Sequence, residues 1–282
     1  ELRALDLQLV LDILRIEEQT ERWAMMMRPA VDLLNDLFQV GDLDAAETLL
    51  TVVLDSTKPP ASKERRQAAL IAVDVLAAGP LMPHLVMHLA TADDARFARI
   101  ERVCAAIGEV LIRPLTEAIS SESRARVRDR LTAILMSFGP AARREVERLK
   151  NSTNPAVRRT AIVLMREFVG REALPQLSAL LADRESQVQR EAVRAILRIG
   201  SDAAFQVLER ALTAGEGAAR DTMLASIASA REDGAGAFCA FLIGRIDHQG
   251  PLGPLYARAI ELLGTLKDPA DRKSTRLNSS HR

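Results

Sequence analysis

The chain has 282 residues, of which 48% are hydrophobic and 3% aromatic, and its formal net charge is zero. A chain of this length can bury a large core, which Leu, Ala, Val and Ile must fill because aromatic residues are few. Zero net charge argues against a protein that binds polyanions over its whole surface. No apolar run reaches the ~18 residues of a membrane-spanning helix. We expect the two cysteines, Cys104 and Cys239, to be reduced and buried, since both lie among apolar residues.

The first 57 residues predict a helical hairpin module. Residues 4–18 place apolar side chains at helical spacing, as an amphipathic helix requires. A second helix is expected from a cap at Thr20 until Gly41, which tolerates the left-handed backbone that ends helices. Asp42 should then cap a third helix.

The segment Ser56–Ser62 is the clearest boundary in the sequence. It contains Pro59 and Pro60, which interrupt helices and favour an extended connector. A helix from Lys63 to Ala78 is expected next, followed by repeats. We therefore predict an N-terminal module over residues 1–57, a repeat domain over 58–270 and a separate tail over 271–282.

Residues 171–200 predict one complete helix–turn–helix unit. Each of its two helices has an apolar face with spacings of three and four residues, formed by Ala173, Leu174, Leu177, Leu180 and Leu181 in the first helix and by Val188, Ala192, Val193, Ile196, Leu197 and Ile199 in the second. The polar turn offers Asp183 and Ser186 as caps of the second helix, which Gly200 should end. Two such short helices cannot cover each other's apolar faces, so copies must stack on both sides.

Imperfect copies of this unit are visible along the chain. The glycines that end successive second helices, Gly108, Gly139, Gly170 and Gly200, are separated by 31, 31 and 30 residues. This period predicts an all-α fold, an α-solenoid of about six stacked antiparallel helix pairs.

The repeat resembles the HEAT repeat family, specifically the short bacterial type also found in phycobilin lyase-like proteins. The resemblance covers residues 80–268 and rests on the turn Asn154-Pro155, the pair Val157-Arg158, the alanines Ala161 and Ala192 and the terminal glycines. Two positions depart from the pattern, because Phe97 stands where an arginine is expected and Ala230 where a glycine is expected. The resemblance implies stacked helix pairs with a concave surface built by the second helices.

Charge is distributed unevenly along the chain. Residues 1–55 contain twelve acidic residues and four arginines, whereas residues 124–166 contain ten arginines and one lysine against three acidic residues. Because equivalent positions of stacked repeats align, we take as the candidate binding surface Arg124, Arg126, Arg128, Arg130, Arg158 and Arg159. Three interpretations stay open: arginines that are solvated or pair with turn acids of adjacent repeats, which we favour, an acidic protein partner, and the phosphate backbone of a nucleic acid.

The sequence indicates no catalytic, cofactor or metal site. His84 and His88 are four residues apart on one predicted helix, a spacing that suits a metal, but no glutamate lies between them. The His-Glu dipeptides that HEAT-type metal hydroxylases use as iron ligands are absent from the sequence. The Gly/Pro-rich segment 249–254 is either a loop of an atypical terminal repeat or a recognition loop.

We therefore expect a bacterial, cytoplasmic, non-enzymatic scaffold that binds a protein partner on its concave helical surface, without membrane attachment. Nucleic-acid binding through residues 124–166 is the alternative, and a phycobilin lyase-type enzyme is a weaker one. Residues 271–281 resemble a translated sequencing adaptor, so we expect the tail 271–282 to be non-native and the sequence to be a fragment of a longer protein.

Overall fold

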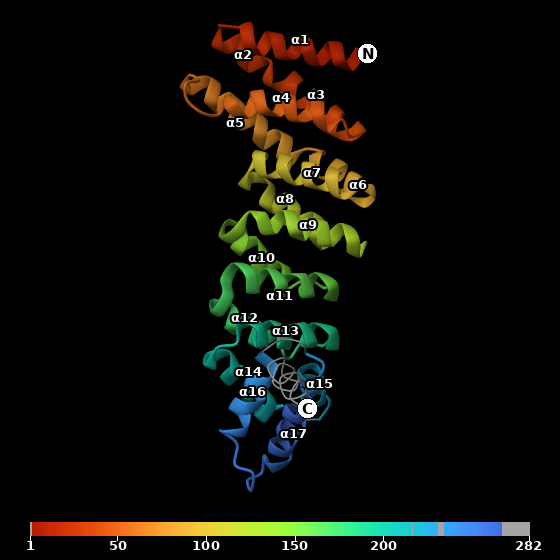
Figure 1. The fold of residues 1–282 in the computed structure, drawn as a ribbon. Coiled ribbons are helices and arrows are strands. Elements are labelled where there is room, and N and C mark those ends of the chain that lie inside the picture. The colour runs from red at the N-terminus through yellow and green to blue at the C-terminus, as the bar shows by residue number, and fades with distance from the viewer. Residues whose placement is uncertain (1, 216, 231–233, 267–282) are drawn as a thin grey trace, which may run out of the picture. The chain divides into compact units, whose positions relative to one another are not determined.

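The computed structural model describes residues 2–215, 217–230 and 234–266 (Figure 1). Over these residues the chain is helical and contains no β-strand. The chain divides into two compact units, Glu1–Glu145 (unit 1) and Val146–Arg282 (unit 2). The tail predicted over 271–282 lies outside the described residues.

Unit 1 consists of nine α-helices and two 3-10 helices before the helix that contains the division. They are α1 (Leu2–Ile16), α2 (Thr20–Met25), α3 (Met27–Val40), α4 (Leu43–Asp55), α5 (Lys63–Ala78), α6 (Leu81–Thr91), α7 (Asp94–Ile107), η1 (Glu109–Leu111), α8 (Ile112–Ser121), α9 (Ala125–Ser137) and η2 (Gly139–Ala142). The division between the units falls within α10 (Arg143–Leu149).

Unit 2 continues with α11 (Pro155–Val169), η3 (Gly170–Ala173), α12 (Leu174–Leu180), α13 (Ser186–Ile199), α14 (Asp202–Ala214), α15 (Gly217–Ala228), α16 (Gly234–Ile243) and α17 (Gly253–Thr265).

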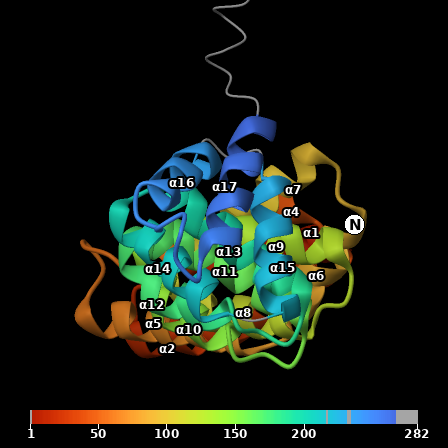
Figure 2. The same cartoon turned by 90° about the horizontal axis from the view of Figure 1, so that it is seen from below.

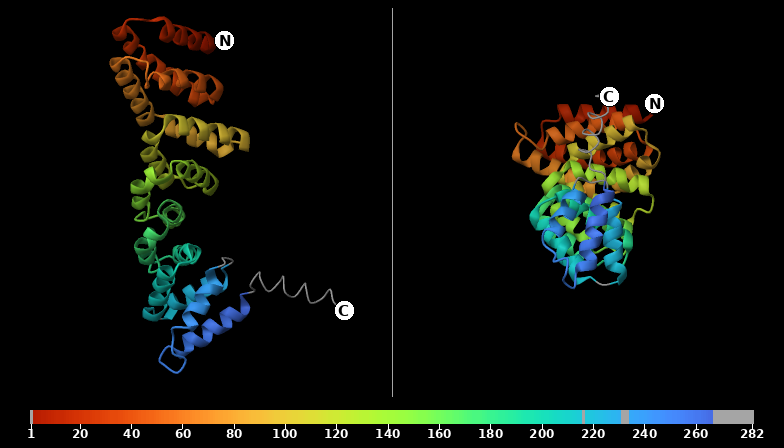
Figure 3. Two further views of the ribbon diagram at one scale, coloured as in Figure 1. Left: turned by 60° about the vertical axis from the view of Figure 1, so that its left-hand side comes forward. Right: turned by 60° about the horizontal axis from the view of Figure 1, so that its bottom comes forward.

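Within each unit, helix pairs stack on their neighbours. In unit 1, the first helices α6 and α8 contact each other, as do the second helices α7 and α9 (Figures 1 and 3). In unit 2, the first helices α12, α14 and α16 contact in sequence, and so do the second helices α11, α13, α15 and α17. Figure 2 looks along this stack and superposes α11 and α13, which are in contact. The predicted all-α solenoid of stacked pairs is confirmed.

The repeat glycines have the backbone conformation that their position requires. Each of these glycines lies within two residues of the end of a second helix and has a positive φ, between 57° and 91°. They are Gly108, Gly139, Gly170 and Gly200. A side chain at such a φ would press its Cβ against the backbone, so glycine is favoured there. The regular spacing in the sequence therefore reports a repeated helix end.

The hairpin over residues 171–200 has the predicted core but not the predicted caps. The apolar residues assigned to its two inner faces are buried, except Ile199, which is only partly buried. Ser186 is already inside α13, and the N-cap residue, Glu185, makes no side-chain capping bond. Asp183 instead accepts a hydrogen bond from the Glu185 N–H within the turn, and its carboxylate also binds Arg158 of the preceding pair.

The N-terminal module differs from the prediction in one helix. The helix expected from Thr20 to Gly41 is divided at Met26 into α2 and α3, because Pro29 has no N–H to donate to the carbonyl of Met25. The side chain of Thr20 does not cap α2. Gly41 and Asp42 act as predicted: Gly41 has φ 76° and the carboxylate of Asp42 accepts from an N–H of α4.

The connector Ser56–Ser62 lies inside unit 1. The following helix α5 begins at Lys63 and ends at Ala78, as predicted, and packs against α2, α3 and α4 as well as α6. The domain boundary between residues 57 and 58 therefore stays a prediction.

In the described part of the chain no single helix is long and apolar enough to cross a membrane. Together, α5 and α6 reach that length and hydropathy, although they are bent by 55°.

Candidate functional site

The four candidate arginines of unit 1 lie on or beside α9, and two of them are buried. Arg128 and Arg130 are each 9% exposed. The Nη1 atom of Arg128 donates to the carbonyl of Glu122 in the turn of its own pair, at 3.0 Å. That of Arg130 donates to the carbonyl of Leu89 at 2.7 Å. Both guanidinium groups therefore satisfy backbone carbonyls that would otherwise lack a partner.

Arg130 also contacts Phe97, which stands where the repeat pattern has an arginine. Its guanidinium lies over the Phe97 ring, 5.3 Å from the centroid, which is the geometry of a cation–π contact. Arg130 and Arg126 both donate to carbonyls near the C-terminal end of α6, at Leu89 and Ala92. These contacts join α9 to the preceding helix pair, so the aromatic residue in the earlier repeat receives an arginine from the next one.

Arg124 is exposed but paired. Its Nε and Nη2 atoms donate to the two carboxylate oxygens of Glu122 at 2.9 and 2.7 Å. These hydrogen bonds, together with the Arg124 N–H, outweigh burial and lower the pKa of Glu122 to about 2. The Glu122–Arg124 pair therefore stays charged over the whole physiological range.

In unit 2, Arg158 is the centre of a buried turn network. It is 5% exposed, and its Nε and Nη2 atoms donate to both oxygens of Asp183 at 2.8 and 2.7 Å. Its Nη1 donates to the carbonyls of Ser152 and Thr153 in its own turn. Burial would raise the pKa of Asp183, but the bonds from Arg158 and from the Glu185 N–H together lower it. The interpretation that the arginine after Val pairs with a turn acid of the adjacent repeat is confirmed at Arg158.

The six arginines therefore do not form one exposed surface. Three of them, Arg128, Arg130 and Arg158, are buried and hydrogen-bonded within the chain. The others are exposed: Arg124, Arg126 and Arg159. The repeat period does not predict this difference in burial, because it aligns equivalent positions but does not show whether their side chains point to the turn or to solvent.

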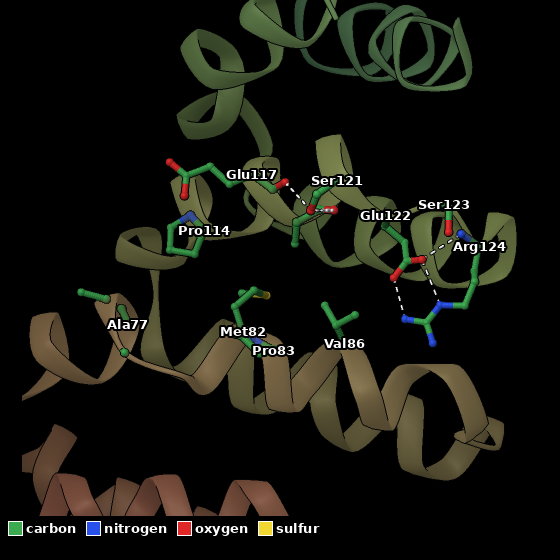
Figure 4. Close-up of a pocket in the computed structure, with 13 residues that line it drawn as sticks. Ala77, Met82, Pro83, Val86, Pro114, Glu117, Ser121, Glu122, Ser123 and Arg124 are labelled. Carbon is green, nitrogen blue, oxygen red and sulfur yellow. Dashed lines mark hydrogen bonds and ion pairs between the residues drawn. The ribbon is translucent and has the colours of Figure 1, made fainter. Parts of the chain in front are cut away.

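A groove of about 640 Å³ lies between the first helices α6 and α8 of unit 1 (Figure 4). Apolar side chains from both helices line it: Met82, Pro83, Val86, Pro114 and Ala118. Figure 4 shows Met82 and Val86 on α6 and Pro114 on α8 facing the same space, with the Glu122–Arg124 pair at one end. The groove combines an apolar lining with a charged end.

Beside this groove, α5 leaves large apolar side chains in solvent. Leu70, Ile71 and Val75 are 47%, 52% and 53% exposed. Ile71 and Val75 are four residues apart and so share a face of α5, and Ala78 on the next turn lines the groove. The opposite face of α5 is buried. Over residues 68–78 the sequence of α5 contains one charged residue, Asp74, so both faces of this part of the helix are largely apolar, which indicates a second covered side.

A second groove, of about 790 Å³, lies in unit 2 between the first helices α12 and α14. Its apolar lining includes Leu174, Pro175, Leu181, Val207, Ala211 and Met223. Arg210 is the one charged residue among those that line it. The sequence does not reveal this groove, because the groove depends on how far apart α12 and α14 lie.

His88 and the two cysteines make contacts within the fold. His88 Nε2 lies 2.7 Å from the carbonyl oxygen of Phe38, so it donates there, and Nδ1 faces Arg96 at 3.4 Å. No cluster of three or more metal-ligating side chains occurs among the described residues. The predicted buried free thiols are confirmed at Cys104 and Cys239, where burial raises the pKa to about 12 and about 11.

Comparison with known proteins yields a family match over part of the chain. A model described as HEAT repeats matches residues 143–228. No curated protein sequence matches the chain.

Solved structures show likeness at low identity. An engineered protein is 16% identical, with 92% of this chain and 97% of that one covered and a TM-score of 0.29. The complex of CpcE and CpcF of phycocyanin lyase from Nostoc sp. PCC7120 is 15% identical, with 93% and 94% covered and a TM-score of 0.29. A chain from the computational design of self-assembling cyclic homooligomers is 13% identical, with 99% and 95% covered and a TM-score of 0.19. These scores support no inference about function. The family match shows HEAT repeats over residues 143–228, and the helix pairs within each unit stack on their neighbours.

Proposed function

We propose that the chain is a non-catalytic scaffold that binds a protein partner through its stacked helices. The observation that carries this proposal is the exposed apolar face of α5, with Leu70, Ile71 and Val75 each about half exposed. Apolar surface in water costs free energy, roughly 25 cal/mol per Å², and a cluster of exposed apolar side chains beside a polar residue, here Asp74, is typical of a site that another protein covers.

Two further observations agree with this function. HEAT repeats, which residues 143–228 match, generally mediate protein–protein interaction. Both grooves are open and lie between neighbouring helices, and their lining combines apolar and polar side chains. Such surfaces suit the side chains of a partner helix better than they enclose a small molecule.

The position of the binding face is part of the proposal. The resemblance to HEAT repeats favours the concave face built by the second helices. The exposed residues of α5 and both grooves instead lie along α5 and the first helices. A cytoplasmic location remains a prediction from the sequence.

Nucleic-acid binding is the less favoured alternative. It requires several exposed cations along one surface, and three of the six candidate arginines are buried. Of the exposed ones, Arg124 is neutralised by Glu122. No observation favours a lyase-type activity.

The experiment compares the chain with a surface variant, Leu70→Ser/Ile71→Ser/Val75→Ser, as baits in extracts of the source cells. We expect specific proteins to copurify with the wild-type chain and to be lost with the variant, and the purified partner to form a stoichiometric complex by light scattering. Circular dichroism checks that the variant remains helical. In parallel, labelled duplex DNA and single-stranded RNA are titrated at low salt. Absence of any protein partner, with salt-sensitive binding of either nucleic acid, would replace this function by the alternative.

A further inference from the structure

The groove of unit 2 lies between two neighbouring helices and could accept one more helix. It runs between α12 and α14, which contact each other (Figure 1). Its edges carry small residues, Ser178 and Ala182 on the α12 side and Ala203, Ala211 and Ala214 on α14. Small residues at an edge let another helix approach closely, and the apolar floor offers a surface for its side chains.

The groove carries a cation, Arg210, that pairs with no acidic side chain among the described residues. Arg210 is exposed, and its Nε donates at 3.3 Å only to the carbonyl of Gln206 on its own helix. The lining residues include no Asp or Glu. The carboxylate of Glu209 beside it is held by Arg245, with distances of 2.8 and 3.0 Å. Asp202, on the same helix, is two turns away, which is ~12 Å along the axis.

The groove of unit 1 provides the contrast. It is lined by two carboxylates, Glu117 and Glu122, and its arginine, Arg124, is already bound to Glu122. The two grooves therefore differ in charge: the arginine of the unit 1 groove has a carboxylate partner, whereas that of the unit 2 groove has none among the described residues.

We propose, on the basis of the protein-binding function above, that the groove of unit 2 binds an acidic amphipathic helix of a partner protein. The apolar face of that helix would cover the groove floor, and a carboxylate at its edge would pair with Arg210. A helix is favoured over a β-strand because a strand binds by adding to a sheet edge, and the described residues contain no strand.

The test uses two fluorescein-labelled 16-residue peptides as probes, which have Leu at the same helical positions and either Glu or Lys at the flanking positions. Titration with the full chain at low ionic strength, followed by fluorescence anisotropy, should show at least about tenfold tighter binding of the Leu/Glu peptide, equivalent to ~1.4 kcal/mol. Arg210→Glu should abolish or invert this preference, and high salt should reduce it. Ala182→Trp, at an exposed position, should weaken both peptides by obstructing the groove.

A matched control lies on the other face of the same unit. Arg190, on the second helix α13, is exposed and, like Arg210, makes its hydrogen bonds only to its own helix. Arg190→Glu makes the same charge change and should leave both affinities unchanged. Circular dichroism of each variant confirms that it folds.

Three results would overturn the proposal. They are equal loss of affinity in Arg190→Glu and Arg210→Glu, no preference for the Leu/Glu peptide, and self-association of the chain that Arg210→Glu abolishes. The last would make a second copy the occupant, since α1 exposes Leu5 and Leu9 beside Asp6. The proposed function is tested separately: a copurified partner that binds Arg210→Glu and wild type equally refutes the groove but leaves the scaffold function intact.

Discussion

Arg158→Met should destabilise unit 2 more than other arginine substitutions in the candidate set. The guanidinium of Arg158 makes four hydrogen bonds, two to Asp183 and two to carbonyls in the turn before α11. Both side chains of the ion pair are largely buried, with 6% and 8% exposed. Methionine keeps much of the apolar stem but removes every donor.

The expected cost follows from what the substitution leaves behind. Removing one partner of a buried ion pair costs ~3–5 kcal/mol, mainly because the other charge stays buried without compensation. Asp183 keeps one bond, from the Glu185 N–H, and water can reach the turn carbonyls once the side chain is shortened. We therefore expect the lower part of this range, about 3 kcal/mol.

Urea unfolding followed by circular dichroism measures the effect as a shift of the transition of unit 2. Arg159→Met is the matched control, because Arg159 is exposed and makes one hydrogen bond, to Gln187, so its loss should cost less than ~0.5 kcal/mol. The double variant Arg158→Met/Asp183→Leu should recover most of the loss, since it leaves no unpaired charge. A loss below ~1 kcal/mol in Arg158→Met, or no recovery in the double variant, would refute the reasoning.

Three further predictions concern the glycines of α16, the carboxylate of Glu122 and the thiol of Cys104. Gly234→Ala should destabilise unit 2 by ~1–3 kcal/mol, because the added Cβ would overlap the carbonyl oxygen of Leu197. Gly236→Ala in the same helix meets nothing within 4 Å and should stabilise unit 2 by ~0.5–1 kcal/mol, measured by the same urea unfolding. Glu122→Gln should destabilise unit 1 by ~1 kcal/mol at neutral pH. Since the pKa of Glu122 is lowered from 4.5 to about 2, the carboxylate's contribution is complete above 4.5 and is lost as pH falls towards 2, so the difference from wild type should shrink over that window, and a constant difference would contradict it. The thiol of Cys104, buried and with its pKa raised to about 12, should react with a disulfide reagent at pH 8 only after denaturation; rapid labelling of the native chain would show that α7 opens.

The repeat could be predicted from the sequence because its determinants are local. Apolar spacings of three and four residues define the buried face of each helix, and glycine tolerates the positive φ at which a helix ends. These signals predicted a helix from about Lys63 to Ala78, where α5 lies, and located Gly108, Gly139, Gly170 and Gly200. Where a local signal was overlooked, at Pro29, the predicted single helix was wrong, and the chain forms α2 and α3 instead.

The candidate arginines show where local information ends. The sequence gives the same weight to Arg158 and Arg159, which are adjacent, yet one is buried against Asp183 and the other faces solvent. A helix turns by 100° per residue, so adjacent residues point to different surroundings. Which of them meets a neighbouring repeat depends on how the helices pack.

For this protein, the sequence by itself determined that the chain is helical, where most of its helices end and that its pairs must stack, since these follow from spacing and backbone preference. Only the tertiary structure decided which arginines are buried and paired within the stack and which are exposed to solvent. The pairing of Arg158 with Asp183 joins positions 25 residues apart, and the grooves between α6 and α8 and between α12 and α14 exist only once neighbouring pairs have set the distance between their first helices. An arginine stays unpaired, or a groove stays open, when the packing of neighbouring helices does not use it. Because that packing involves several segments, no single segment of the chain specifies the outcome.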